Sequence, residues 1–482
     1  MSVSPNDLAT ILPELVLVLA GGALVLADAF APALRPRFGL LAGLSAVVAL
    51  LLRWVEPLPG PVWAGALMVD PLARFVDTYI LAALLLVAVM ADPYLARTGT
   101  RYGEFYGLLL WSATGAMVLA KADNLLVVFV ALELLSISLY VLNAFHRESG
   151  ISLEAGWKYL VLGAFASAFL LFGIALLYGA TGTFSLRATA DVIGAVPLPA
   201  RPLLLAALAL ILTGFGFKLA LVPFHAWAPD VYQGAPTPVT AFLSVVPKGA
   251  ALIVLARVVA TVSPQILTPR WLPLLATVAV ASQTLGNLVA IAQRDVKRML
   301  AYSGIAHMGY ALVGLVAFGF DGLTGVLVYL AAYTFMNIAA FAVVSAFSES
   351  EDEPHLITDL AGQGWQRPFL SFSLALSMFS LAGIPPTIGF VAKFLVFRAA
   401  VNEDLVWLAV VGVLNSLISV FFYVRVVYFL YMKPLQRRAP SYSEPWLVKL
   451  VAGVCALAMV VLGVFPAWLV SAAEFAARIL VR

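Results

Sequence analysis

Four ionisable side chains lie within long apolar stretches of this chain: Glu133, Lys218, Lys248 and Lys393. A lysine at the centre of a membrane-spanning helix costs about 2.5–3.5 kcal/mol on insertion scales, so such residues usually face a bundle interior or a wet cavity and mark ion or proton paths. Groups of this kind on separate helices at one depth can pass a proton along, if each lies within hydrogen-bond reach of the next. The residue types and their positions therefore predict a proton relay.

Glu133 lies inside the apolar stretch NLLVVFVALELLSISLYVLNAF, and we expect it to pair with the cation of Lys218. The alternatives for Glu133 are a purely structural ion pair or a neutral acid held by hydrogen bonds. For Lys218 the alternative is a long side chain that reaches the membrane surface. We favour the relay because the apolar run continues on both sides of Lys218.

A proline follows Lys218 closely. Pro223 lacks a backbone donor and clashes one turn back, so it is expected to break the helix and free the carbonyl of Leu219. A broken helix at membrane depth is tolerated only where protein or water covers the freed groups. The pairing of a buried lysine with a helix break marks this segment as the centre of the site.

The second break is predicted in the segment GIPPTIGFVAK, which ends at Lys393. Its double proline removes the donors that would have reached the carbonyls of Leu381 and Ala382. Corresponding interrupted helices in two halves of a chain favour a transporter built from inverted repeats, with its path at the repeat interface.

Three further residues are auxiliary candidates. Lys158 follows Glu154 by four residues, which favours a helix-end ion pair, and a modulating role near Lys218 is the alternative. His225 and His307 can act as proton shuttles, because an unperturbed imidazole titrates near pH 6.5; His225 could instead serve only as a hydrogen-bond partner in the first break. The four histidines show no HxxxH or HxxE spacing, so no metal site is expected.

The composition indicates what must position these residues. Of the 482 residues 63% are hydrophobic and 11% are charged, whereas about a quarter are charged in a typical soluble domain. We predict an all-α polytopic membrane protein with about fourteen transmembrane helices and broken helices 7 and 12, the first run being a retained span. The apolar runs lie near 11–30, 38–54, 70–91, 105–121, 123–145, 156–179, 203–222, 238–260, 271–292, 299–319, 323–347, 368–400, 404–432 and 446–477.

The chain is predicted to divide into helices 1–3 at 1–104, a first repeat at 105–262, a second inverted repeat at 263–435, and a last helix with the C-terminus at 436–482. Basic residues such as Arg97, Arg101 and Arg298 concentrate in alternate connections, with scattered singles such as Lys121 and Arg187 in the others. This bias predicts that both termini lie outside the cytoplasm.

Several classes of function are excluded. Cys455 is the single cysteine, so the chain has no cysteine set for an iron–sulfur cluster or a thiolate zinc site. GxGxxG, Walker A, HExxH and GxSxG motifs are missing, and there is no basic stripe of the kind that binds nucleic acid. The energy source is therefore expected to be an ion gradient or a partner subunit, with no cofactor in this chain.

The segments KLALVPFHAWAPDVYQGAPTPV and RDVKRMLAYSGIAHMGY resemble the two signature segments of the antiporter-like proton-translocating subunits of respiratory complex I, shared with Mrp-type cation/proton antiporters. The likeness runs from about residue 105 to 432. It implies fourteen helices, two inverted five-helix repeats and discontinuous helices 7 and 12. Its relay residues match Glu133 on helix 5, Lys218 on helix 7, Lys248 on helix 8 and Lys393 on helix 12.

The resemblance also implies a setting for the chain: a translocating subunit of a bacterial NADH:quinone oxidoreductase in the inner membrane, beside the antiporter-like M subunit and the small K subunit. FMN, iron–sulfur clusters and quinone would belong to partner subunits. Lysine at position 393, together with a chain end at Arg482 soon after the last apolar run, favours one branch of the family, which has lysine there and lacks a long lateral helix.

Three alternatives to this reading stay open. The first is a cation/proton antiporter subunit of an Mrp or membrane hydrogenase complex. The second is an independent transporter of a small solute, and the third is a membrane scaffold whose lysines only hold helices together.

Overall fold

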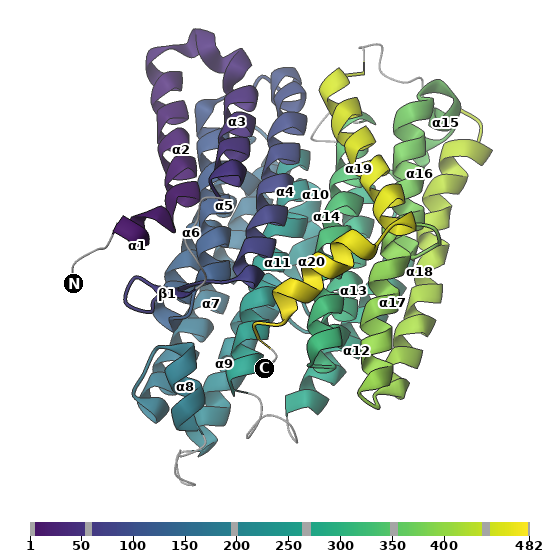
Figure 1. Ribbon diagram of the computed structural model, residues 1–482. Coiled ribbons are helices and arrows are strands. Elements are labelled where there is room, and N and C mark those ends of the chain that lie inside the picture. Colours follow the sequence, from purple (N-terminus) through teal and green to yellow (C-terminus); the bar gives the residue numbers. More distant parts are fainter. Residues whose placement is uncertain are drawn as a thin grey trace.

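The protein is a bundle of long helices that run up and down past one another (Figure 1). The computed structural model describes residues 5–53, 60–193, 201–262, 271–347, 355–435 and 444–480. Within these ranges eleven helices are long and apolar enough to cross a membrane, and three shorter apolar helices accompany them. The prediction of an all-α polytopic membrane protein is confirmed, with one short β-hairpin added.

The N-terminal helices form one side of the bundle, coloured purple to blue in Figure 1. Their connection holds the hairpin, in which Gly60 pairs with Val69 in antiparallel register. The elements of this part are α1 (Pro5–Ala9), α2 (Leu12–Phe30), η1 (Pro32–Arg37), α3 (Phe38–Leu52), β1 (Gly60–Val62), β2 (Leu67–Val69), α4 (Pro71–Arg97), α5 (Gly103–Lys121) and α6 (Leu125–Asn143).

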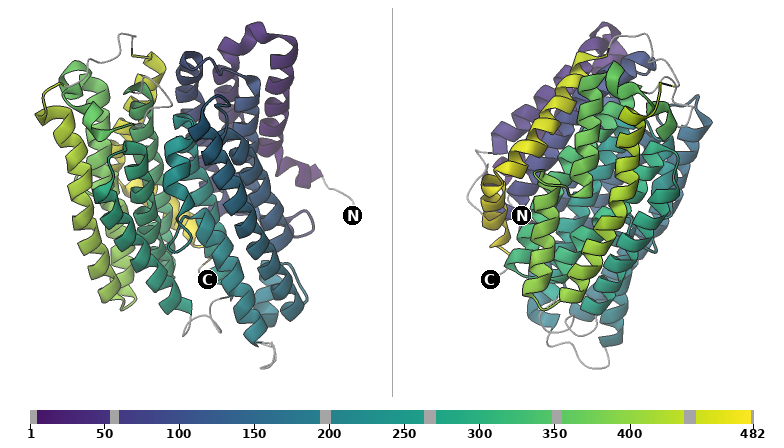
Figure 2. Two further views of the ribbon diagram at one scale, coloured as in Figure 1. Left: turned by 180° about the vertical axis from the view of Figure 1, so that it is seen from behind. Right: turned by 90° about the vertical axis from the view of Figure 1, so that its right-hand side faces the viewer.

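The middle of the chain supplies the centre of the bundle. Figure 2 shows from behind that these teal and dark green helices lie between the N-terminal helices and the light green group. They are α7 (Gly150–Thr181), α8 (Leu186–Ile193), α9 (Arg201–Lys218), α10 (Trp227–Gly234), α11 (Thr237–Val262), α12 (Trp271–Ala292), α13 (Val296–Val316) and α14 (Phe320–Phe347).

The last part completes the other side of the bundle. It consists of η5 (Ile357–Leu360), α15 (Gln363–Gln366), α16 (Pro368–Ala382), α17 (Ile388–Asn402), α18 (Val406–Met432), α19 (Trp446–Val464) and α20 (Ala467–Ala477). Helix α20 crosses the front of the bundle obliquely in Figure 1 and packs on α14 and α4.

Burial distinguishes central from peripheral helices. The apolar window of α11 is wholly buried, and those of α13 and α14 are 94% buried, whereas α2 and α19 bury only 33%. A helix that is apolar all round suits a position inside a bundle or a membrane. The helices that carry Lys248 and His307 are therefore enclosed by protein, while the outer helices expose Leu, Val and Phe side chains, as a lipid-facing surface requires.

Both predicted helix breaks are present. Helix α9 stops at Lys218 and α10 begins at Trp227; α16 stops at Ala382 and α17 begins at Ile388. The first helix ends earlier than Pro223 alone would require, because Ala220 has a positive φ of 54° and turns the chain before the proline. The second ends at Gly383, whose φ of 85° gives a left-handed C-terminal cap.

A third break was not predicted. The run 446–477 was expected to form one helix, and the structure divides it at Phe465 and Pro466 into α19 and α20. Proline at this position lacks the donor that would continue the hydrogen-bond ladder of α19. At the end of α19, Gly463 lies against the second helix break: a Cβ atom there would stand 2.2 Å from the carbonyl oxygen of Pro386 and 2.5 Å from the carbonyl carbon of Thr387.

The connections collect at the two ends of the bundle. At one end Arg97 donates to the carbonyl of Ser345, at 3.0 Å, and Arg298 pairs with Asp230 at 2.6 Å. At the other end Arg187 lies 3.7 Å from Asp123.

Lys121 is different from what the sequence suggested. It is not a residue of an exposed connection, because it ends α5 with 1% exposure. Its ammonium lies 2.7 Å from Glu14 and 3.1 Å from Asp77. It is thus a buried ion-pair residue that ties α5 to α2 and α4.

Candidate functional site

Lys218 is the last residue of α9 and is 3% exposed. The chain turns away directly after it, so its side chain projects from a helix end into the bundle. Its Nζ atom donates to the hydroxyl of Tyr159 at 3.3 Å. The sequence placed Lys218 correctly but offered no signal for Tyr159, an aromatic residue in an apolar helix.

Aromatic rings surround this ammonium. The Lys218 Nζ atom lies 4.8 Å from the ring centroid of Tyr159, 5.5 Å from that of Tyr140 and 5.9 Å from that of Phe217. Such contacts stabilise a cation by about 0.5–2 kcal/mol each, more when water is excluded. Trp227 at the start of α10 stacks on Tyr159, and its indole N–H donates to the carbonyl of Phe217 at 2.9 Å. The first break and α7 thus build one pocket for the ammonium.

Glu133 does not contact Lys218. The hydroxyl of Ser167 on α7 donates to the Glu133 carboxylate, and among the described residues no ion pair joins Glu133 to Lys218. Glu133 still acts on Lys218 by a longer-range charge interaction, and Tyr140 lies close to both groups. The predicted direct pair is therefore wrong in this conformation: serine and tyrosine side chains stand where the ion pair was expected.

Lys248 occupies the centre of the bundle at 1% exposure, one residue after the proline inside α11. Within the described residues its Nζ atom has no hydrogen-bond partner, and its cation faces the ring of Tyr232 at 5.3 Å. The absence of a side chain at Gly304 makes room for it: a Cβ there would lie 2.8 Å from Lys248 Nζ and 2.8 Å from the Tyr333 hydroxyl. Lys248 is thus held against α13 and α14 by shape, without a fixed counter-ion.

His307 is the hub between the central and the last lysine. Its Nδ1 atom lies 2.6 Å from the hydroxyl of Tyr329, and its Nε2 atom lies 2.9 Å from the hydroxyl of Tyr423. The ring of Tyr333 lies 5.1 Å away. An imidazole with hydroxyl partners on both nitrogens can take a proton on one side and release it on the other.

Lys393 lies in the first turns of α17 and is 5% exposed. Its Nζ atom donates to the carbonyl of Ala382 at 3.0 Å and to Ser416 at 2.9 Å, and faces the ring of Tyr310 at 4.9 Å. Ala382 carries one of the carbonyls that the double proline was expected to free. The lysine therefore binds the very group that the helix break exposes.

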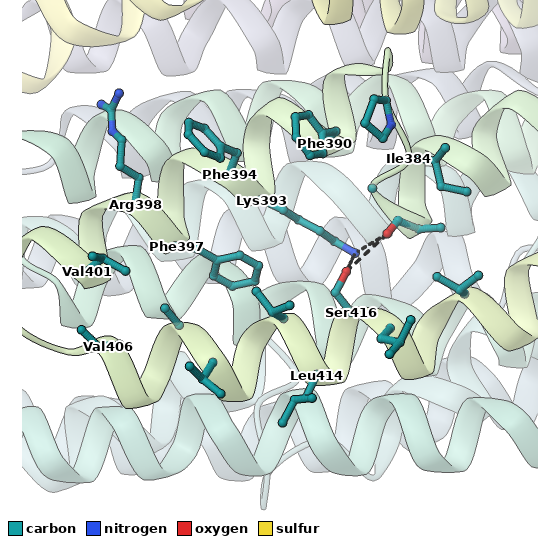
Figure 3. A pocket seen from close by; sticks show the side chains of 18 residues that line it. Ile384, Phe390, Lys393, Phe394, Phe397, Arg398, Val401, Val406, Leu414 and Ser416 are labelled. Carbon is teal, nitrogen blue, oxygen red and sulfur yellow. Dashed lines mark hydrogen bonds between the residues drawn. The ribbon is translucent and has the colours of Figure 1, made fainter.

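A cavity of about 820 Å³ opens beside Lys393 between α17 and α18. Figure 3 shows the ammonium pointing toward Ser416, with Phe390, Phe394 and Phe397 along the wall. Most of the other lining side chains are also apolar, such as Val406 and Leu414. The last lysine is thus a polar group in the wall of an apolar cavity.

Of the three auxiliary candidates, Lys158 and His225 are separated from these lysines. Lys158 forms the expected pair with Glu154, at 2.7 Å, and a second one with Asp230, at 2.6 Å. These contacts are partly exposed and do not include Lys218, so the helix-end ion pair is the interpretation that the structure favours. His225 lies in the first break, and its Nδ1 atom has no hydrogen-bond partner among the described residues. It does not contact the lysine row.

Chemically, the site is a line of proton-binding groups. Lys218, Lys248, His307 and Lys393 come from four different helices and are almost fully buried, and each has a tyrosine ring beside it. No group of three or more His, Cys, Asp or Glu side chains capable of holding a metal ion occurs in the described ranges. The fold and this row define a class: an antiporter-like, polytopic membrane subunit with its titratable residues in the bundle core.

Comparison with known proteins agrees with that class. Residues 122–419 match the family described as "NADH:quinone oxidoreductase/Mrp antiporter, TM", and the chain belongs to this family. It is 40% identical over 480 residues to NADH-quinone oxidoreductase subunit N of Trichlorobacter lovleyi, covering 98% of both chains. It is 39% identical to the subunit of the same name of Myxococcus xanthus, covering 96% of both. Both relatives are thus named as the N subunit.

Solved structures show the same fold. A chain of respiratory complex I from Thermus thermophilus with bound aureothin superposes with a TM-score of 0.81 at 33% identity, over 95% of this chain and 99% of that one. A chain of the Mrp complex from Dietzia sp. superposes with a TM-score of 0.85 at 23% identity, over 98% of this chain and 97% of that one. The Mrp likeness is one of fold.

Proposed function

We propose that this protein is the N-type membrane subunit of a NADH-quinone oxidoreductase and translocates protons through its buried lysine row. The observation that carries the proposal is that Lys218, Lys248 and Lys393 are buried on separate helices, with no carboxylate within ion-pair distance of any of them in the described part of the chain. The names of the relatives support the assignment to this complex.

The chemistry follows from burial. A buried ammonium without a fixed counter-ion is stable only while nearby groups compensate it, so a change of charge at one station alters the proton affinity of the next. In this scheme Glu133 sets the charge near Lys218, and His307, which has a tyrosine hydroxyl at each ring nitrogen, carries the proton between Lys248 and Lys393. A proton loaded at one station can therefore be driven along the row when the charge at its end changes.

The rest of the assignment belongs to the proposal. Electron transfer from NADH through FMN and iron–sulfur clusters to quinone takes place in partner subunits. The antiporter-like M subunit and the small K subunit are the membrane neighbours, in the bacterial inner membrane, with both termini on the periplasmic side. Residues 105–262 and 263–435 act as two inverted halves, because each contains one broken helix that ends beside a relay lysine.

Lys218→Ala tests the relay. We expect NADH-driven proton uptake by inside-out membrane vesicles to slow by about tenfold or more, because loss of a proton-transfer group typically costs at least that much. Assembly is measured separately as the amount of intact complex and its NADH oxidation with an artificial acceptor. Lys449→Ala is the matched control, because Lys449 is a partly exposed lysine of α19 that pairs with Glu444. Full pumping by Lys218→Ala would reject the relay.

A second candidate, a cation/proton antiporter subunit of an Mrp complex, is favoured by the shared fold. The two assignments differ in their partners. Purification in mild detergent followed by identification of the associated polypeptides separates them: NADH-oxidising subunits support the proposal, and their replacement by antiporter subunits supports the second candidate.

A further inference from the structure

Helix α12 carries a buried polar stripe that the relay does not use. Ser282, Gln283 and Asn287 are each no more than 1% exposed, although α12 is otherwise an apolar helix. Buried polar side chains in a membrane-spanning helix usually hold another helix or line a path. Their contacts therefore indicate what α12 does.

Ser282 reaches the first helix break. Its hydroxyl accepts from the backbone N–H of Val222 at 3.0 Å, in the segment between α9 and α10. This donor lies four residues after Lys218 and has no place in a helical ladder, because α9 has already ended. An unmet buried N–H would cost about 1–3 kcal/mol, so Ser282 fixes the course of the chain just beyond the first relay lysine.

Asn287 contacts two groups that lie close to Lys393. Its Nδ2 atom donates to the hydroxyl of Tyr310 at 2.8 Å, and to the backbone carbonyl of Asn415 at 3.1 Å. The ring of Tyr310 faces the Lys393 ammonium, and Ser416, next to Asn415, binds it. A backbone carbonyl can only accept, so the contact identifies the NH₂ group of Asn287 and orients the amide.

The two contacts are joined by a rigid segment. Ser282 and Asn287 are five residues apart, about 7.5 Å along the helix. Helix α12 also packs on α13 with direct backbone contact: a Cβ at Gly286 would stand 2.7 Å from the backbone nitrogen of Ala306, and one at Gly309 would stand 2.8 Å from that of Gln283. A shift of α12 against its neighbours cannot occur without movement of α13, which carries His307 and Tyr310.

We propose that α12 couples the two helix breaks, with Ser282 and Asn287 as positioning residues: Ser282 holds Val222 in the first break, and Asn287 holds Tyr310 and the backbone of α18 on either side of Lys393. This inference rests on the proposed function, because it assigns a role in proton transfer along the lysine row. A change at Lys218 that moves the first break is passed through α12 to the surroundings of Lys393.

Among the described residues, six titratable groups could contribute to the pH dependence of proton transfer near Lys393. They are His307 and Tyr310 on α13, Tyr329 and Tyr333 on α14, Tyr423 on α18, and Lys248 on α11. Neither Ser282 nor Asn287 titrates, so any effect of replacing them on a pH profile must act through these groups or through Lys393 itself.

The test compares Ser282→Ala, Asn287→Leu and the double variant in the assembled complex, in inside-out vesicles. The measurement is NADH-driven proton uptake from pH 6 to pH 9, with NADH oxidation by an artificial acceptor as the assembly control. We expect each single variant to shift the pH midpoint of pumping by about 0.5–1 unit, the size typical of changes along a coupling network. The double variant is expected to shift it no further than the larger single effect, since both residues act through one helix.

Two further variants keep the test decisive. Thr277→Val is the matched control: it removes an exposed hydroxyl of the same helix that binds the carbonyl of Pro273 within α12, and it should leave the pH profile unchanged. Tyr310→Phe removes the hydroxyl held by Asn287 but keeps the ring, so it should reproduce the Asn287→Leu shift if that variant fails to assemble.

Wild-type profiles for Ser282→Ala and Asn287→Leu, or shifts that simply add in the double variant, would overturn the coupling role of α12. Lys393→Ala in the same assay separates this failure from failure of the proposed function. Lost pumping in Lys393→Ala with wild-type behaviour of the α12 variants would reject only the coupling, whereas full pumping in Lys393→Ala would reject the relay.

Discussion

At the scale of single residues, the site consists of buried lysines whose ammonium groups contact aromatic rings and a backbone carbonyl instead of water. Lys218 faces Tyr159 and Tyr140, and Lys393 binds the carbonyl of Ala382. These partners stabilise the charged form without supplying a permanent negative charge. The arrangement therefore leaves the proton of each lysine able to respond to charge changes elsewhere.

Tyr159 offers a test of the aromatic contribution. Tyr159→Phe keeps the ring beside Lys218 and loses only the hydroxyl contact, whereas Tyr159→Leu loses both. Because a cation–π contact is worth about 0.5–2 kcal/mol, we expect Tyr159→Leu to slow pumping by about three- to tenfold and Tyr159→Phe by less than about threefold. Pumping rates in vesicles with equal amounts of complex measure the difference. Equal effects of the two variants would show that the ring contributes nothing.

His355 gives a prediction on pH. It lies outside the membrane-spanning helices, where its backbone N–H donates to Asp295 at 2.8 Å. Burial, together with the nearby cations of Lys297 and Arg97, lowers the pKa of its imidazole to about 3. Below about pH 6.5 the unfolded chain binds a proton that the folded chain does not, so the stability present above pH 6.5 is lost progressively as the pH falls toward 3.

The loss amounts to at most about 1.4 kcal/mol per pH unit in that window. His355→Gln should reduce it, because glutamine does not titrate. Thermal unfolding of the complex in detergent at pH 7.5 and pH 5.5 measures the effect, and the variant should show a smaller decrease in melting temperature than the wild type. An equal decrease in both proteins would contradict the assignment to His355.

At the scale of helices, two of the three breaks were predicted and their boundaries were not. Prolines in apolar runs indicated both interruptions, and the double proline even indicated the carbonyl of Ala382. Helix α9, however, ends at Lys218 because of the positive φ of Ala220, which no residue type announces. The direct Glu133–Lys218 pair was wrong because helix packing places Ser167 against the carboxylate. Such choices depend on contacts between helices, which a single sequence does not reveal.

Helix α12 illustrates the same limit. Ser282 and Asn287 are common residues in a run that the sequence identified only as a membrane span. Their partners, Val222 and Tyr310, lie 60 and 23 positions away in the chain. The available signal was a polar residue inside an apolar run, but the predicted site contained only charged residues and histidines.

Gly463 yields a prediction for the packing of α19 on the second break. A larger side chain must displace the backbone of Pro386 and Thr387, which leads to α17 and Lys393. Overpacking of this kind costs about 1–3 kcal/mol, so Gly463→Val should lower the melting temperature and slow pumping. Gly22→Val on α2 is the control, because a Cβ there meets nothing within 4 Å. Wild-type stability and pumping in Gly463→Val would contradict the close approach.

At the scale of the whole molecule, composition predicted the architecture: an apolar chain of this length becomes a bundle of membrane-spanning helices. The centre, α11, α13 and α14, holds Lys248 and His307, and the two broken helices flank it with Lys218 and Lys393. The order of these residues across the bundle comes from how the helices pack. The tyrosine rings beside these residues, such as Tyr159 and Tyr310, were not predicted from the sequence.

The oblique course of α20 has a consequence for biosynthesis. This helix is among the last to leave the ribosome, yet its buried face, with Leu469 and Ala473, rests on α14 and on α4, which is made near the beginning. Until synthesis reaches that segment, an apolar strip of α4 remains uncovered by its final neighbour. A chain interrupted before Ala467 would therefore leave this strip of α4 without the protein cover that α20 provides.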